Sequence, residues 1–209
     1  VEMFPKVRKP EAERLVEETF VAVTLWREDV PPAVRNRDAV MSVSGNLQFV
    51  DGGSILTYKD RQYVANTSRR GGVDYDRNIR AVYLPVVRSS MYDVFTAFDL
   101  PDPSTPQGDR DSTIVAPQAL FMMNGTVVLS GTRKMADGLL ALPDDFARIR
   151  DAYERALSRP PTPREIDQAM TMIGSIEKAL PADTKDRRAL AWQSFCKSLL
   201  ASNEFIYMN

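Results

Sequence analysis

The sequence predicts a mainly α-helical protein with minor β structure, in which an irregular N-terminal half precedes an antiparallel C-terminal helical bundle. Three observations support this prediction. Apolar residues recur at helical spacing through most of residues 143–202, as in amphipathic helices. Helix start and stop signals flank several of these segments. Residues 50–76 instead hold two glycine pairs and only short apolar runs, which are typical of loops with brief strands.

The length of 209 residues suits a single domain with a sizeable core. We interpret residues 1–209 as one domain with an irregular half, 10–125, and a bundle half, 126–209. The first residue is Val1, so we interpret the chain as a fragment of a longer protein.

The N-terminal half begins with an amphipathic pattern that predicts a helix over residues 10–26. Pro31 and Pro32 are expected to end any helix there. The apolar stretch 39–47 predicts a second helix up to Gly45. Short strands are expected at 55–58 or 62–65, and residues 80–87 are expected to be extended.

The middle of the chain predicts three helices around a loop rich in proline and aspartate. The first covers residues 91–98 and is capped by Ser89 or Ser90. The second starts at Ala116–Pro117 and ends before Asn124–Gly125, and Thr126 caps the third. We expect the whole stretch 79–125 to clamp the irregular half onto the bundle.

The C-terminal third carries the clearest helical signals. Thr162, Pro163 and Glu165 match a capping box, with threonine at the N-cap and glutamate three residues later. Apolar spacing predicts helices over 143–158, 163–180 and 186–202, after which Phe205 and Tyr207 are expected to dock on the bundle. Trp192 and the single cysteine, Cys196, are expected to be core residues.

The composition excludes several kinds of chemistry. The chain has no histidine, so it lacks the commonest general base and metal ligand, and Ser-His-Asp and Cys-His mechanisms are excluded. A formal net charge of −1 provides no global field for nucleic acid. No apolar run approaches the roughly 20 residues of a transmembrane helix, so no membrane insertion by this chain is expected.

An ordered series of blocks carries a family resemblance. These blocks are RAVYLPVVR, FDLPDPS, GDRDSTIVAPQALFMMNG, RIRDAYERALSRPPTPREI and AWQSFCKSLLASNEFIYMN, preceded by MSVSGNLQFVDGG. Over about residues 10–209 the chain resembles the C-terminal domain of unknown function in long planctomycete-type proteins, which often carry an N-terminal cytochrome-c-like segment. The resemblance implies export and attachment to a bacterial cell surface, in genomes rich in sulfatases, and no assigned activity. The cytochrome motif is absent here, so the resemblance implies no haem role.

Four carboxylates in the proline-rich loop form a candidate calcium site: Asp99, Asp102, Asp109 and Asp111. Oxygen ligands of this kind can wrap a calcium ion, although the spacing matches no EF-hand. The alternative is structural, with the aspartates capping turns or pairing with Arg110. We expect no cofactor other than this candidate calcium ion. The same acids together with Glu204 are also candidates for a glycosidase pair, and the alternative is that they are surface acids or helix caps.

Aromatic and cationic side chains suggest a ligand site. Exposed aromatic faces stack on sugars, and the less regular half of the chain carries several such residues. The candidate ligand-binding residues are Tyr83, Arg80, Arg88 and Arg110, whose guanidinium groups suit an anion such as sulfate. Core packing of the tyrosine and structural Arg–Asp pairs are the alternatives.

Two functions follow from these features. The first is a non-catalytic interaction or assembly domain of a larger exported protein, linked to polysaccharide. The alternative is a carboxylate-based hydrolase or lyase acting on (sulfated) polysaccharide, or a carbohydrate-binding module. The expected partners are other domains of the same longer chain and carbohydrate, without nucleic acid. The expected location is the cell surface or periplasm.

Overall fold

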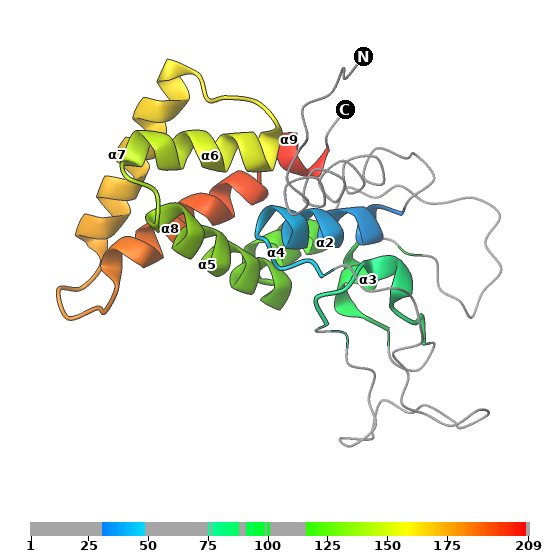
Figure 1. Ribbon diagram of the computed structural model, residues 1–209. Coiled ribbons are helices and arrows are strands. Elements are labelled where there is room, and N and C mark those ends of the chain that lie inside the picture. Colours follow the sequence, from blue (N-terminus) through cyan, green and yellow to red (C-terminus); the bar gives the residue numbers. More distant parts are fainter. Residues whose placement is uncertain are drawn as a thin grey trace, which may run out of the picture.

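The computed structural model describes residues 31–48, 75, 77–87, 91–98, 100 and 116–207. This part of the chain is mostly helical, and its C-terminal helices form a bundle (Figure 1). The elements in chain order are α2 (Pro32–Val43), the 3-10 helix η1 (Ala81–Tyr83), α3 (Asp93–Ala97), α4 (Ala116–Asn124), α5 (Thr126–Leu140), α6 (Asp145–Leu157), α7 (Pro163–Ala179), α8 (Arg187–Leu200) and α9 (Asn203–Ile206).

Helix α8 is the centre of the bundle, and it contacts α4, α5, α6, α7 and α9. Trp192 and Leu200 on α8, Met135 and Leu139 on α5, and Ile149 on α6 are all fully buried. Each of these three helices therefore buries an apolar stripe against a neighbour, as helical periodicity requires. The sequence-based prediction of a mainly helical fold with a C-terminal bundle is confirmed.

Two neighbouring helices of the bundle run in opposite directions. The side-chain amide of Gln193 on α8 donates to the backbone carbonyl of Leu129 early in α5, at 3.1 Å. On the other side, Ser198 late in α8 contacts Met172 in the middle of α7, while Arg188 early in α8 lies near Glu177 at the end of α7. The order of the two α7–α8 contacts makes this pair antiparallel.

Side-chain hydrogen bonds fix where two bundle helices begin and where α5 ends. The capping box predicted for α7 is present, with Thr162 and Glu165 each accepting from the other's backbone N–H. Asp144 caps α6 by accepting from Ala147 at 2.8 Å. At the end of α5 the guanidinium of Arg148 donates to the carbonyls of Leu139, Leu140 and Leu142, which satisfies groups that a helix end leaves without partners.

Helix α2 begins earlier than the sequence predicted. The two prolines were expected to stop a helix, and a helix was expected only from residue 39. Instead Pro32 is the first residue of α2, because the first turn needs no backbone N–H and favours the fixed φ of proline. The expected end near Gly45 is confirmed, since Gly45 has a φ of +69° just beyond the helix.

Three local predictions in the middle of the chain are wrong. Residues 81–83 form η1, so the stretch 80–87 is not extended throughout. Helix α3 starts after Tyr92 and has no side-chain cap, so neither predicted serine caps it. Gly125 precedes α5, which makes Thr126 its first helical residue rather than its cap. The minor β component, in the described residues, is an isolated parallel bridge between Gln48 and Ile79.

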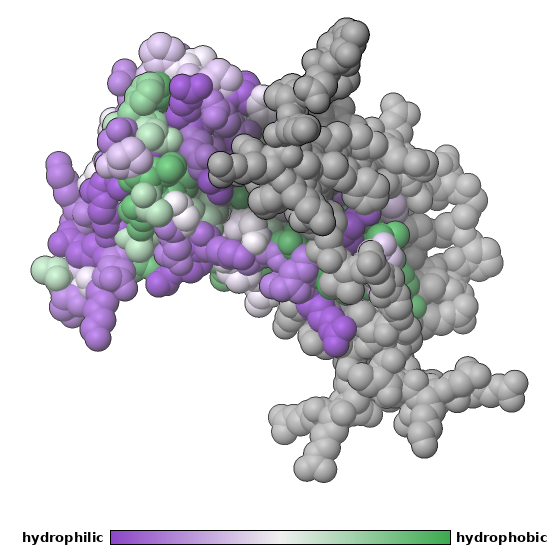
Figure 2. Space-filling view, in the orientation of Figure 1, coloured by the Kyte–Doolittle hydropathy of each residue, from purple (hydrophilic) through white to green (hydrophobic). Residues whose placement is uncertain are grey.

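The predicted burial is correct for most of the bundle. Trp192, Cys196 and Phe205 are buried, and burial raises the pKa of the Cys196 thiol to about 12. Tyr207, which was expected to dock on the bundle, is exposed, as is Met170. Phe146 shares the apolar spacing of the buried Ile149 and Tyr153 but is 54% exposed. Hydrophobic surface gathers over the start of α6 and over α7, surrounded by hydrophilic residues (Figure 2).

The predicted helix at 10–26 and strands at 55–58 or 62–65 lie outside the described residues.

Candidate functional site

Residues 77–87, which we call the strap, contain the two predicted ligand-binding residues that the structure describes. Arg80 directly precedes η1 and Tyr83 is its last residue. The other candidates, Arg88 and Arg110, lie outside the described residues, as do all four aspartates of the predicted calcium site, Asp99, Asp102, Asp109 and Asp111. The calcium site therefore stays a prediction.

A buried ion pair on α2 holds the strap. The guanidinium of Arg37 is fully buried and donates to the backbone carbonyls of Ile79 at 2.7 Å and Arg77 at 2.6 Å. It also donates to the carboxylate of its neighbour Asp38 at 3.2 Å. The same carboxylate oxygen accepts from the backbone N–H of Ala81 at 2.8 Å. The side chains of two adjacent charged residues thus supply the hydrogen-bond partners that a sheet or helix would otherwise provide for the strap backbone.

Burial dominates the electrostatics of this pair. Removal from water raises the pKa of the Asp38 carboxyl, although the bond from Ala81 and the positive charges of Arg37 and Arg80 act in the opposite direction. A buried pair of this kind contributes little net stability by itself. Its role here is to satisfy backbone groups and to define where the strap lies.

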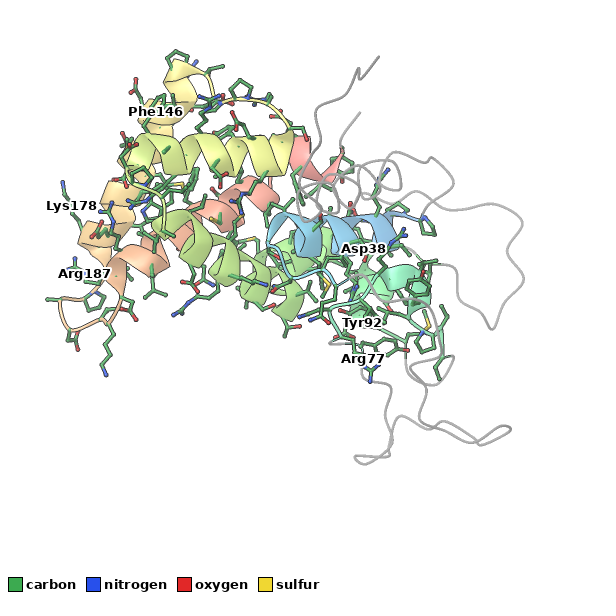
Figure 3. All side chains as sticks on the ribbon, viewed as in Figure 1. Asp38, Arg77, Tyr92, Phe146, Lys178 and Arg187 are labelled. Atoms are coloured by element: carbon green, nitrogen blue, oxygen red, sulfur yellow. The ribbon has the colours of Figure 1, made fainter. Side chains whose placement is uncertain are left out.

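Three aromatic rings complete the support of the strap. Tyr75 stacks on Tyr92 with ring centroids 4.8 Å apart, and Phe95 meets both rings edge-on. The Tyr75 hydroxyl donates to the carbonyl of Pro85 at 3.1 Å, and the Arg37 guanidinium lies 5.8 Å from the Tyr92 ring centroid. Figure 3 places Asp38, Tyr92 and Arg77 at the α2–α3 end of the molecule, away from Lys178 and Arg187 at the far end of the bundle.

The outer side of the strap is apolar and open to solvent. Val82 is 61% exposed, Val86 is 47% exposed and Tyr83 is 39% exposed, whereas Ile79, Ala81 and Leu84 are buried. The strap therefore alternates between anchoring residues and a ridge formed by Val82, Tyr83 and Val86, which we call the strap ridge. Sequence reasoning missed the anchor, because Arg37 and Asp38 belong to the polar run RNRD and precede the helix expected from residue 39.

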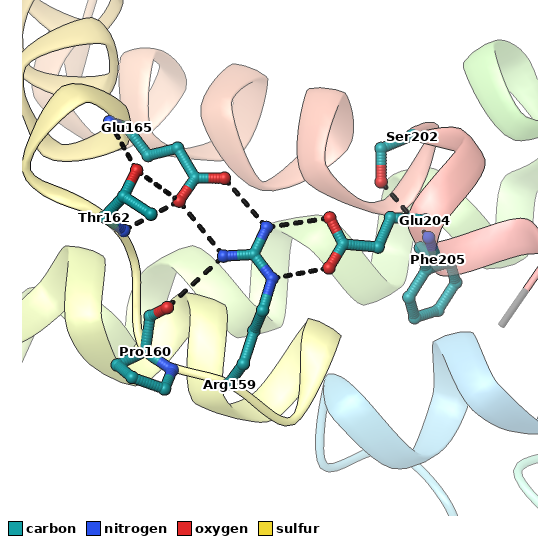
Figure 4. A network of polar contacts seen from close by, with 7 residues as sticks. All are labelled: Arg159, Pro160, Thr162, Glu165, Ser202, Glu204 and Phe205. Carbon is teal, nitrogen blue, oxygen red and sulfur yellow. Dashed lines mark hydrogen bonds and ion pairs between the residues drawn. The ribbon is translucent and has the colours of Figure 1, made fainter. Parts of the chain in front are cut away.

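A second polar cluster joins the ends of three helices (Figure 4). Arg159, just after α6, donates two bonds to Glu165 at 2.8 and 3.0 Å. It donates two more to Glu204 of α9 at 2.6 and 2.8 Å. Its guanidinium also lies 5.6 Å from the ring centroid of Tyr153. Bidentate geometry on both sides makes this a fixed three-residue bridge.

This cluster bears on the glycosidase hypothesis for Glu204, whose candidate partner aspartates lie outside the described residues. The structure brings Glu204 and Glu165 together, but on opposite sides of one arginine. Hydrogen bonds from Arg159 lower the pKa of Glu165 to about 2 and also lower the pKa of Glu204. A general acid in a glycosidase needs a raised pKa. Neither carboxylate therefore has the raised pKa of a general acid, and both join helices through Arg159.

We expect the cluster to make stability depend on pH in a defined window. A carboxyl whose pKa is lowered by folding contributes stability above its unfolded value, and this is lost as pH falls through its folded value. For Glu165 that window runs from 4.5 down to about 2. Melting temperatures measured across it should fall more steeply for the wild type than for Arg159→Met. Melting temperatures that fall equally steeply with pH in the two proteins would contradict this role of the Arg159 cluster.

Among the described residues, no three His, Cys, Asp or Glu side chains are grouped so that they could hold a metal ion. The same part of the chain contains no helix that is both long and apolar enough to cross a membrane. The described geometry thus consists of a helical bundle, a buried anchor and an apolar ridge.

A comparison with protein families matches most of the chain to one family. Residues 28–173 match the family described as "Protein of unknown function (DUF1553)", and the chain belongs to this family. The match begins just before α2, and it ends within α7. Searches of curated proteins and of solved structures each found no match.

Proposed function

We propose that this chain is a non-catalytic interaction or assembly domain of a longer, exported bacterial protein that handles polysaccharide. The strap ridge is the observation that carries the proposal. Val82, Tyr83 and Val86 are exposed, and the backbone that leads into them is held at residues 77 and 79 by a fully buried arginine. Large side chains on a pre-organised support are what a binding surface needs, because little flexibility is lost on association.

The carboxylates described here support the non-catalytic part of the proposal. Asp38 accepts from Arg37 and Ala81, Glu165 and Glu204 share Arg159, and Asp145 accepts from Arg188 and Arg148. Acids held in this way are structural. The cell surface or periplasm as location, and the link to polysaccharide, rest on the family resemblance of the sequence blocks.

The test measures binding of this domain to the remainder of its parent chain, expressed separately, by titration calorimetry. A double variant, Val82→Asp with Val86→Asp, should weaken binding by about tenfold or more, because buried interface anchors typically contribute over 1 kcal/mol each. Phe146→Asp is the matched control, since Phe146 is equally exposed but lies on α6. Equal affinity of the double variant and the wild type would contradict the proposal.

Carbohydrate binding is the second candidate, and Tyr83 beside Arg80 favours it, since an exposed aromatic ring and a guanidinium suit a sulfated sugar. In affinity electrophoresis, a sulfated polysaccharide in the gel should then retard the wild-type protein and should not retard Tyr83→Ala.

The same experiment with calcium or a chelator tests the ion predicted at Asp99, Asp102, Asp109 and Asp111. Release of new reducing ends would contradict a non-catalytic role.

A further inference from the structure

The first part of the strap backbone is held by polar groups that lie close together in the sequence. Its backbone at residues 77, 79 and 81 is bonded to Arg37 and Asp38. The carbonyl of Asn78 accepts from the N–H of Gln48 at 2.6 Å, five residues beyond the end of α2. All four contacts therefore belong to α2 and the residues that leave it.

The interior of the bundle is held together differently. The core around Trp192, Met135, Leu139 and Leu200 is apolar and is shared by α5, α6 and α8. Local opening occurs in contiguous units, and units with few buried apolar contacts open at the lowest free energy. The strap buries three apolar side chains, Ile79, Ala81 and Leu84, in addition to its polar contacts.

We infer that the strap opens and closes without unfolding of the helical bundle, and that the buried Arg37–Asp38 pair is the latch that keeps it closed. Both partners are needed for the latch, since Arg37 binds the carbonyls and Asp38 binds the N–H of Ala81. Closure sets the position of Val82 and Tyr83, which directly follow the anchored residue Ala81. Opening removes the strap ridge as a fixed surface.

A role for this opening in partner binding rests on the proposed function, but the opening itself is measured without any partner. Native-state hydrogen exchange of the full chain, read by mass spectrometry at low urea concentrations, separates local from global opening. The informative strap amides are Ala81, Tyr83 and Leu84, together with Gln48, whose N–H groups are bonded in the closed state. The reference amides are those within α5 and α8.

In the wild type, the strap amides should exchange at least about tenfold faster than the α8 amides after correction for intrinsic rates, with a weaker dependence on urea. Asp38→Ala should accelerate the strap amides by a further factor of about ten or more, because it leaves Arg37 buried without its carboxylate. The α5 and α8 amides should stay near their wild-type rates.

Two matched variants sharpen the result. Asp38→Asn keeps an oxygen that can accept from Ala81 and should have a smaller effect than Asp38→Ala. Asp137→Asn removes an exposed carboxylate paired with Arg133 on α5 and should leave the strap unchanged. If Asp38→Ala does not fold, the wild-type exchange pattern still decides the question.

A common exchange rate and urea dependence for strap and bundle amides in the wild type would overturn the inference, since the two would then form one cooperative unit. Equal acceleration of both by Asp38→Ala would also overturn it. Independent opening of the strap, together with no binding of any partner to the strap ridge, would contradict the proposed function and still support the latch.

Discussion

Replacing Trp192 with alanine is expected to lower the free energy of unfolding by about 3–5 kcal/mol, which is the usual cost of emptying a large aromatic site in a core. The ring is fully buried at the centre of α8. It meets Phe195 edge-on at 5.7 Å, and the Arg148 guanidinium lies 5.9 Å from its centroid. Urea denaturation followed by circular dichroism measures the change.

Trp192→Phe separates the volume of the ring from its polar atom. The indole N–H is buried and finds no hydrogen-bond partner among the described residues. Phenylalanine removes this unsatisfied donor and part of the volume, so we expect a loss of only about 1–2 kcal/mol. Phe146→Ala, at a site 54% exposed, is the control and should change stability by less than about 0.5 kcal/mol. Equal losses for Trp192→Phe and Trp192→Ala would contradict this account of the core.

The second large effect is expected at the junction of α4 and α5, where Gly125→Ala should destabilise the protein by about 1–3 kcal/mol, a typical cost of overpacking. A Cβ atom at Gly125 would lie 2.7 Å from the Phe121 ring and 2.8 Å from the Phe121 carbonyl oxygen. The ring has little room to move because it meets Phe98 edge-on at 5.7 Å. The backbone φ of Gly125 is −59°, so the expected cost is steric and not conformational.

Gly138→Ala is the matched control for this effect. Gly138 lies within α5, and a Cβ atom there would meet nothing within 4 Å. Alanine favours a helix interior over glycine, so this variant should be more stable than the wild type by about 0.5–1 kcal/mol. Thermal denaturation of both variants should therefore move the melting temperature in opposite directions. A neutral or stabilising Gly125→Ala would show that the α4–α5 junction is looser than described.

The fold could be predicted well wherever local signals were strong. Periodic apolar residues identified α6, α7 and α8, and the Thr162–Glu165 capping box located the start of α7 within a residue. The exposure of Phe146 could not be predicted in this way, because periodicity shows which residues share a face but not whether a neighbour covers the end of it. Likewise, Pro32 signals a stop or a start equally well until the chain that follows is known.

The candidate site was predicted only in part. Arg80 and Tyr83 were chosen from residue type alone, and the structure places them on a strap whose anchor, Arg37 and Asp38, lies some forty residues earlier in the chain. Glu204 was considered as a catalytic acid, but Arg159, 45 residues away, binds it. Both sets of contacts join distant segments, which no local pattern records.

The sequence by itself determined that this protein is a helical domain without histidine chemistry, because helix formation and the inventory of side chains are local properties. The tertiary structure alone decided which charges are buried and which are exposed. Arg37 became an anchor because the strap backbone needed partners where water was excluded, and Glu165 and Glu204 became bridging residues because three helix ends converge on Arg159. Charge burial depends on where distant segments meet, and that is a property of the packed chain.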